Sequence, residues 1–107
     1  MKLTDARTLL KEIRNKDERI SIRPHAWKDH PERKFSPLEL VRLLQGKGGL
    51  HDNKYPTAAA GSFLWICRDE DGRKTELAIV FEADKSGDLI VIIHAYREIG
   101  NEKNNSK

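Results

Sequence analysis

The sequence predicts one α+β domain, in which N-terminal helices pack on an antiparallel sheet that ends in a three-stranded meander. Three observations lead to this fold class. Apolar residues recur at helical spacing in the first half of the chain, and three apolar segments separated by Asp- and Gly-containing turns fill the second half. The length of 107 residues suits a single core. We assign residues 1–100 to this domain and expect the polar tail, residues 101–107, to be frayed.

A first helix and a short strand are predicted near the N-terminus. The helix runs from Thr4, which can cap it, to about Asp17. Its apolar stripe has the spacing of one helical face and comprises Leu3, Ala6, Leu10 and Ile13. Residues 19–23 then alternate apolar and polar side chains and predict a short strand, which Pro24 ends. Residues 25–33 can form a further short helix.

A second strong helix start lies at Ser36. The serine can cap the helix, Pro37 takes its first position, and Glu39 stands three residues after the serine, as in a capping box. Gly46 ends the helix. The residues expected to face inward are Leu38, Val41 and Leu44. Residues 46–61 are mostly small or polar and predict a long loop that is mobile or is ordered by a partner.

Three strands are predicted at residues 62–68, 74–82 and 88–96. The segments between them, residues 69–72 and 84–87, each begin with Asp and end with Gly, which is the turn chemistry of consecutive hairpins. Alternation in the middle strand places Leu77, Ile79 and Phe81 on one face and Ala78 and Val80 on the other.

Positive charge is concentrated in the N-terminal third of the chain. Residues 1–34 hold ten Lys and Arg against six Asp and Glu, a balance of +4, whereas the whole chain carries +3. This excess favours a polyanionic partner, and the alternative is a solvated surface of mixed charge. The longest apolar run, residues 89–93, is too short to span a membrane, and the N-terminus lacks the apolar block of a secretion signal. With a single cysteine, Cys67, these features predict a cytoplasmic protein without membrane association.

The end of the last strand carries candidate functional residues. Counting by twos places His94 and Tyr96 on the face that also holds Ile90 and Ile92. With Arg97, these polar side chains follow an apolar run, where a hydrophobic sheet opens to solvent. Such a position suits a catalytic or binding histidine, and the alternative is a histidine satisfied by hydrogen bonds at the core margin.

A second histidine, His25, follows the first predicted strand as His94 ends the last. The two can converge if these strands are neighbours. The residues expected to contact RNA are cations together with one aromatic side chain: Arg23, Trp27, Lys28, Lys47 and Lys54. Cations beside an aromatic surface suit a phosphate backbone and an unpaired base, and the alternative for Trp27 is burial in the core.

Other patterns are weaker. Residues 46–49, Gly-Lys-Gly-Gly, lack the ending of a phosphate-binding loop and follow a helix. A pair of histidines five residues apart, His25 and His30, has no accompanying glutamate, so the sequence predicts no metal and no other cofactor. Cys67 lies in an apolar strand and is expected to be inert core. Glu76 and Glu82 are expected as solvated strand ends.

Short motifs along the chain resemble a known family. They are Ile20-x-Ile22-x-x-His25-Ala26, Arg33-x-Phe35-Ser36 at a helix start, and Val91-Ile-Ile-His-Ala-Tyr-Arg97 in the last strand. Together they resemble small bacterial proteins similar to the BrnT and RelE-like toxins of the barnase/EndoU/colicin/RelE ribonuclease superfamily. The resemblance covers about residues 19–98 and leaves the first helix as an addition.

The resemblance implies RNA bound across an open sheet face, a cognate antitoxin protein as partner, and a RelE/BrnT-like fold. It implies cleavage of RNA without a metal or other cofactor, in which the ribose 2′-hydroxyl attacks the adjacent phosphate. His25 and His94 would transfer protons. Arg33 and Arg97 would stabilise the charge of the phosphorane, with Tyr96 as a positioning group.

A second hypothesis is a non-catalytic module with the same fold that binds RNA or a protein. Pro24 and Asp29 stand where the family motif carries a small hydroxylated residue and an arginine, and these departures favour the binding module. The two strand-end histidines favour the enzyme. A third hypothesis is an accessory protein of a mobile element, held by a partner.

Overall fold

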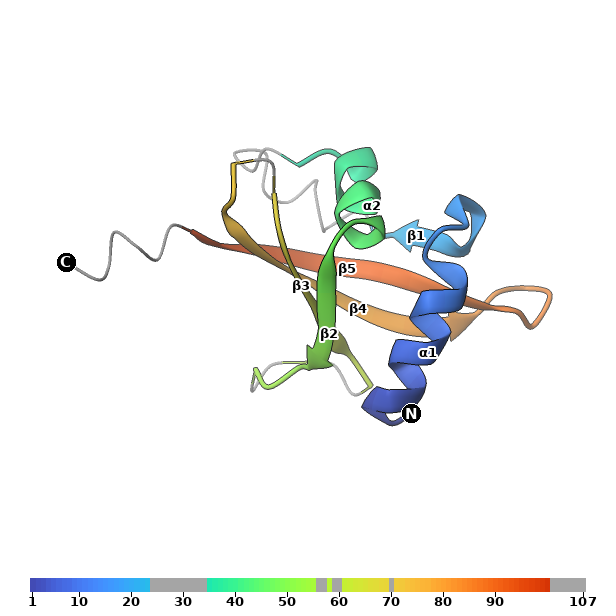
Figure 1. Cartoon of the computed structure of the whole chain (residues 1–107). Coiled ribbons are helices and arrows are strands. Elements are labelled where there is room, and N and C mark those ends of the chain that lie inside the picture. Colours follow the sequence, from blue (N-terminus) through green and yellow to red (C-terminus); the bar gives the residue numbers. More distant parts are fainter. Residues whose placement is uncertain (24–34, 56–57, 59–60, 70, 101–107) are drawn as a thin grey trace.

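A five-stranded sheet carries two α-helices on one of its faces (Figure 1). The computed structural model describes residues 1–23, 35–55, 58, 61–69 and 71–100, and all structural statements concern these. The elements in chain order are α1 (Leu3–Ile13), the 3-10 turn η1 (Asp17–Arg19), β1 (Ile20–Ile22), α2 (Pro37–Gln45), β2 (Gly48–Asp52), β3 (Phe63–Arg68), β4 (Lys74–Ala83) and β5 (Leu89–Gly100). The predicted α+β class is confirmed. The expected short helix at 25–33 and the expected frayed tail at 101–107 fall outside the described residues.

Helix α1 buries the face that its sequence predicts. Its buried residues, Ala6, Leu10 and Ile13, are spaced so that they lie on one side of the helix. The boundaries differ from the prediction, because the helix begins at Leu3 and ends before η1. Thr4 is therefore inside the helix, where its carbonyl accepts a hydrogen bond from the Thr8 hydroxyl, and it does not cap the helix.

Helix α2 begins with the predicted capping box. The Ser36 hydroxyl accepts from the Glu39 amide at 3.3 Å, and the Glu39 carboxylate accepts from the Ser36 amide at 2.9 Å. The predicted inward stripe was wrong in part. Leu40 and Leu44 are fully buried, whereas Leu38 is 58% exposed. Two residues turn a helix by about 200°, so Leu38 points away from the face on which Leu40 lies.

The sheet has the strand order β1-β5-β4-β3-β2. Strands β3, β4 and β5 form the predicted antiparallel meander, but β1 is parallel to β5, so the sheet is mixed and not purely antiparallel. Strand β2 corrects the prediction of a loop over residues 46–61, because Gly48–Asp52 pairs with β3 along its whole length. No helix in the described ranges is long and apolar enough to cross a membrane.

Aspartate side chains build both hairpin turns. The Asp69 carboxylate accepts from the amides of Asp71 and Arg73, both at 2.9 Å. Asp84 does the same for the amides of Ser86 and Asp88, at 2.8 and 3.0 Å. The glycines that close the two turns, Gly72 and Gly87, have φ of 79° and 87°, a region that favours glycine. The predicted hairpins are therefore confirmed.

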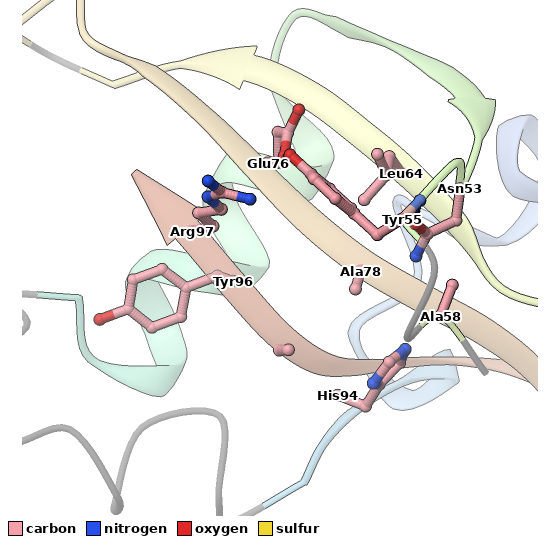
Figure 2. Close-up of a pocket in the computed structure, with 10 residues that line it drawn as sticks. Asn53, Tyr55, Ala58, Leu64, Glu76, Ala78, His94, Tyr96 and Arg97 are labelled. Carbon is pink, nitrogen blue, oxygen red and sulfur yellow. Dashed lines mark hydrogen bonds between the residues drawn. The ribbon is translucent and has the colours of Figure 1, made fainter. Parts of the chain in front are cut away.

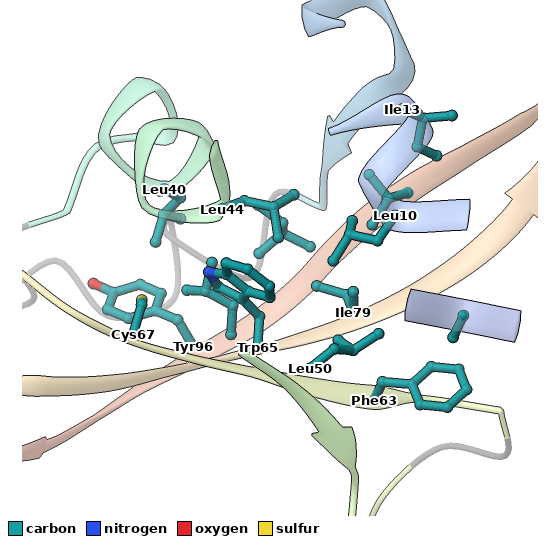
Figure 3. Packing of buried hydrophobic residues seen from close by; sticks show 14 of the residues in the cluster. Leu10, Ile13, Leu40, Leu44, Leu50, Phe63, Trp65, Cys67, Ile79 and Tyr96 are labelled. Atoms are coloured by element: carbon teal, nitrogen blue, oxygen red, sulfur yellow. The ribbon is translucent and has the colours of Figure 1, made fainter. Parts of the chain in front are cut away.

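The hydrophobic core lies between the helices and one face of the sheet (Figure 3). Leu77 and Ile79 of β4 are fully buried there, and Phe81 packs at its margin, as the alternation predicts. Trp65 of β3 is also in this core, and its indole N–H donates to the carbonyl of Leu43 in α2 at 2.9 Å. The second face of the sheet carries Leu64 and Ala78, and it is here that the candidate site lies.

Candidate functional site

The pairing of β5 with β4 steps over a residue of β5 at two points, Ile99 and His94, and the second point lies at the candidate site. Ala78 of β4 pairs with Ala95, and the following residue, Ile79, pairs with Ile93, so the ladder steps over His94. Such a β-bulge re-aims the side chains around it. Beyond the bulge, the residues of β5 that point toward the helices are one position later than a regular alternation would give.

The bulge overturns the prediction that His94 and Tyr96 share a face. Tyr96 pairs with Leu77 and is 6% exposed, and its ring meets Phe35 edge-on at 5.4 Å between centroids. It lies in the helix-side core (Figure 3). The His94 imidazole lies on the other face, where it points toward Ala58 (Figure 2).

A pocket of about 230 Å³ opens on this second face of the sheet. Strands β4 and β5 form its floor, and part of the segment that follows β2 forms its wall (Figure 2). The polar side chains that line it are Asn53, Tyr55, Glu76, His94 and Arg97. Two side chains predicted to be catalytic, those of His94 and Arg97, thus share one cavity with Tyr55 and Glu76, which sequence reasoning did not assign to the site. Tyr96 also borders the cavity, but its ring lies in the helix-side core.

Tyr55, Glu76 and Arg97 form a connected group in the pocket. The Tyr55 hydroxyl donates to Oε1 of Glu76 at 2.6 Å, and the Arg97 guanidinium lies 5.0 Å from the centre of the Tyr55 ring. The pKa of the Tyr55 phenol is raised above its ordinary value, mainly by the hydrogen bond to Glu76. Desolvation and the negative charge of Glu76 raise this pKa further, in that order of size. Arg97 opposes this shift. Tyr55 therefore stays protonated and keeps donating to Glu76 at neutral pH.

Glu76 corrects an expectation, because it is buried and is not a solvated strand end. It is 7% exposed, and in the register of β4 and β5 it lies opposite Arg97. Alternation puts Glu76 on the same sheet face as Ala78, so the carboxylate projects into the pocket wall. A buried carboxylate is costly unless it is hydrogen-bonded, and Tyr55 provides such a bond.

Asn53 holds Tyr55 in position. Its side-chain carbonyl accepts from the Tyr55 amide at 3.1 Å, and its side-chain amide donates to the Ser62 hydroxyl, also at 3.1 Å. The first bond is a local turn typical of asparagine, and the second ties this turn to the residue that precedes β3. The wall of the pocket is thus anchored at both ends of the segment between β2 and β3.

Strands β1 and β5 are neighbours, which is the condition for the two strand-end histidines to converge. Ile22 lies beside Ile93, and the Arg23 amide donates to the Ile93 carbonyl at 3.0 Å. Strand β1 therefore ends beside Ile93, the residue of β5 that precedes the His94 bulge. The remaining predicted site residues in this region lie outside the described residues, namely His25, Trp27, Lys28 and Arg33.

The other cations predicted to contact RNA are dispersed. Arg23 forms an ion pair with Glu82 at 2.8 Å, with both side chains largely exposed. Lys47 and Lys54 are exposed on either side of β2. Lys54 lines a second cavity of about 530 Å³, which shares Tyr55 and Glu76 with the His94 pocket.

The pocket combines the groups that acid–base chemistry on a phosphate ester needs. It holds a carboxylate at Glu76, an imidazole at His94 and a guanidinium at Arg97. These can accept a proton, donate a proton and stabilise negative charge. No cluster of three or more His, Cys, Asp or Glu with the arrangement of a metal site occurs within the described part of the chain.

No family model matches the chain, and neither a curated protein nor a solved structure is significantly similar to it.

Proposed function

We propose that this protein is an RNA-binding endoribonuclease of the toxin type, with a RelE/BrnT-like fold, that acts in the cytoplasm and is held in check by a cognate antitoxin. The observation that carries the proposal is the pocket on the sheet face opposite the helices. It brings a carboxylate, an imidazole and a guanidinium around one cavity of about 230 Å³.

In the proposed reaction, the ribose 2′-hydroxyl attacks the adjacent phosphate and the 5′-oxygen of the next nucleotide leaves. Glu76 takes the proton of the 2′-hydroxyl through Oε2, because Oε1 already accepts from Tyr55. His94 protonates the leaving 5′-oxygen. Arg97 stabilises the negative charge that builds on the phosphorane. This scheme uses side chains of the protein alone, and its products are a 2′,3′-cyclic phosphate and a 5′-hydroxyl.

His25 stays a predicted proton-transfer group of the same reaction, supported by the neighbouring positions of β1 and β5. The scheme distinguishes two base candidates. If Glu76 is the base, Glu76→Gln removes the base while it keeps a similar shape, and His25→Ala leaves most of the activity. If His25 is the base, His25→Ala removes most of the activity and Glu76→Gln leaves most of it.

Cleavage of a labelled single-stranded RNA tests the proposal. We expect His94→Ala to slow cleavage about 100-fold or more, because a positioned general acid contributes at least that factor. The matched control is His51→Ala, which removes an exposed histidine of β2 that lines the neighbouring cavity of about 530 Å³ and not the pocket. Both variants are measured at saturating RNA, so that weaker binding does not change the rate. This control should keep nearly the wild-type rate. Equal rates for the two histidine variants would count against a role of His94 in catalysis.

Arg97→Ala and Arg97→Lys separate charge stabilisation from packing. We expect Arg97→Ala to lose about 100-fold in rate, and Arg97→Lys to recover only part of it, since lysine lacks the planar fork. Circular dichroism and urea unfolding check that the variants fold. Wild-type protein that binds RNA and leaves it intact would reject the enzyme and support a non-catalytic binding module.

A further inference from the structure

A groove on the helix side of the molecule collects three cations of α1. Arg7, Lys11 and Arg14 follow one another at spacings of four and three residues, so they lie on one face of the helix. They line a cavity of about 440 Å³ whose opposite wall is the backbone of β2 at Gly48–Leu50. Strand β2 is an edge strand of the sheet, which leaves this wall accessible from the side.

The two arginines of the groove are held in place by neutral groups. Arg7 donates from Nε and Nη2 to the carbonyl of Leu50, at 3.1 and 3.0 Å. The Arg14 guanidinium lies 4.9 Å from the centre of the Trp65 ring and donates to the Gln45 carbonyl at 3.3 Å. A guanidinium has five N–H donors, so these contacts fix each side chain and leave further donors to meet a ligand.

Among the residues that the structure describes, no carboxylate neutralises the cations of the groove. Within the described ranges, Arg19 and Arg23 form ion pairs with carboxylates of β4 and of the β4–β5 turn, whereas none of the three groove cations has a carboxylate oxygen within 4.0 Å. None of the residues that line the cavity is Asp or Glu. Three neighbouring cations with no carboxylate beside them attract negative charge, so we expect the groove to bind an anionic ligand.

The shape of the groove depends on the absence of a side chain at Gly48. A Cβ atom at this position would lie 2.8 Å from the Trp65 ring and 2.7 Å from the Ile66 carbonyl oxygen. Only glycine therefore lets β2 lie against the indole on which Arg14 stacks. The groove is thus a built feature in which the strand, the indole and the guanidinium depend on one another.

We infer that this groove binds a backbone phosphate of a single-stranded RNA, several nucleotides away from the cleavage pocket. The inference rests on the proposed function, since it extends the binding site of the same RNA molecule beyond the cleavage pocket. The second cavity, of about 530 Å³, supplies that path, because it shares Tyr55, Leu64 and Glu76 with the His94 pocket and reaches Leu3 at the start of α1. The second cavity and the groove share no lining residue, but Leu3 and Arg7 are about one turn apart on α1, and His51 and Leu50 are adjacent in β2. The inferred path of the RNA therefore continues along α1, at the edge of β2, to the cations of the groove.

Lys11 is the residue for the test, because its side chain is exposed and lines the groove. The matched control is Lys85, an exposed lysine in the turn between β4 and β5, at which the same charge change can be made. Binding is measured by fluorescence anisotropy with 2′-O-methylated oligonucleotides, which cannot be cleaved. One has about 3 nucleotides and fills only the pocket, and one has about 12 and reaches the groove.

We expect Lys11→Glu to weaken binding of the longer oligonucleotide about tenfold or more and to reduce its salt slope by about 1 or more. Lys85→Glu should change it less than about twofold, and all three proteins should bind the short oligonucleotide equally. Equal losses for the two lysine variants, or equal losses for the two lengths, would overturn the inference. So would a polyglutamate peptide that displaces the long oligonucleotide as well as inorganic polyphosphate does, because the groove would then select an acidic protein.

The proposed function and this inference fail in different ways. If wild-type protein cleaves RNA and Lys11→Glu behaves as Lys85→Glu does, the groove inference is wrong and the pocket proposal stands. If wild-type protein binds neither oligonucleotide at low salt, both are wrong.

Discussion

The thiol of Cys67 is buried in the core next to the β3–β4 turn, and it gives the molecule a pH-dependent stability. Burial raises its pKa to about 11 from a value of 9.0, with Asp69 adding to the shift. A raised pKa means that the thiolate forms more easily in the unfolded chain than in the folded one. Its contribution to stability is therefore complete below pH 9 and is lost as the pH rises toward 11.

We predict that the free energy of unfolding falls between pH 9 and pH 11 more steeply in wild-type protein than in Cys67→Ala. The difference should reach about 2 to 3 kcal/mol, at about 1.4 kcal/mol for each pKa unit. Urea unfolding at a series of pH values measures it, and each curve is compared with that of the same variant at pH 7. Parallel pH profiles for the two proteins would mean that the thiol does not titrate differently on folding.

Single residues also mark where sequence reasoning succeeded and where it stopped. Alternation assigned the faces of β4 correctly, because that strand has a regular pattern from Leu77 to Phe81. The same counting failed in β5 at Tyr96, because the ladder steps over His94 and the chain has no local signal for a bulge. Tyr55 and Glu76 were missed for a related reason: they meet only through the fold, 21 positions apart in sequence.

At the scale of elements, strand β2 depends on a close approach that glycine permits. We predict that Gly48→Ala lowers the free energy of unfolding by about 1 to 3 kcal/mol, because its Cβ would overlap the Trp65 ring and the Ile66 carbonyl. Gly49→Ala is the matched control. Its Cβ would lie 3.2 Å from the flexible His51 imidazole, which can move aside.

Urea unfolding compares the two alanine variants with wild type. The prediction is a clear loss for Gly48→Ala and a change of less than about 1 kcal/mol for Gly49→Ala. Equal stabilities would mean that β2 can shift away from the indole without cost. A displaced Trp65 would also release Arg14, so we expect Gly48→Ala to weaken binding of the longer RNA when it is measured by fluorescence anisotropy.

Elements were predictable where their signals are local. The capping box at Ser36 and the Asp-to-Gly turns are each complete within about four residues, so the sequence alone located α2 and both hairpins. Strand β2 has one buried apolar residue, Leu50, and its other supports are distant: the ladder to β3 and the two hydrogen bonds from Arg7. Nothing within residues 48–52 therefore distinguishes a strand from a loop.

At the scale of the whole molecule, the two faces of the sheet have different roles: one forms the hydrophobic core and the other carries the proposed active site. One face packs on α1 and α2 and contains most of the buried apolar residues, while the other carries the pocket with His94 and Glu76. Charge along the sequence predicted a positive region in the first 34 residues. It could not predict that Arg19 and Arg23 are paired with carboxylates of distant residues, or that Arg7, Lys11 and Arg14 line one cavity, because pairing and grouping are decided by the fold.

The measurement that tests the central proposal most directly is the identity of the RNA ends after incubation with wild-type protein. A single-stranded RNA and the same RNA with 2′-deoxyribose at every position are compared by mass spectrometry. The proposal predicts fragments that end in a 2′,3′-cyclic phosphate and begin with a 5′-hydroxyl, and none from the deoxy substrate. It predicts that these fragments form about 100-fold more slowly with His94→Ala under the same conditions. Intact RNA, fragments with a 5′-phosphate, or cleavage of the deoxy substrate would contradict it.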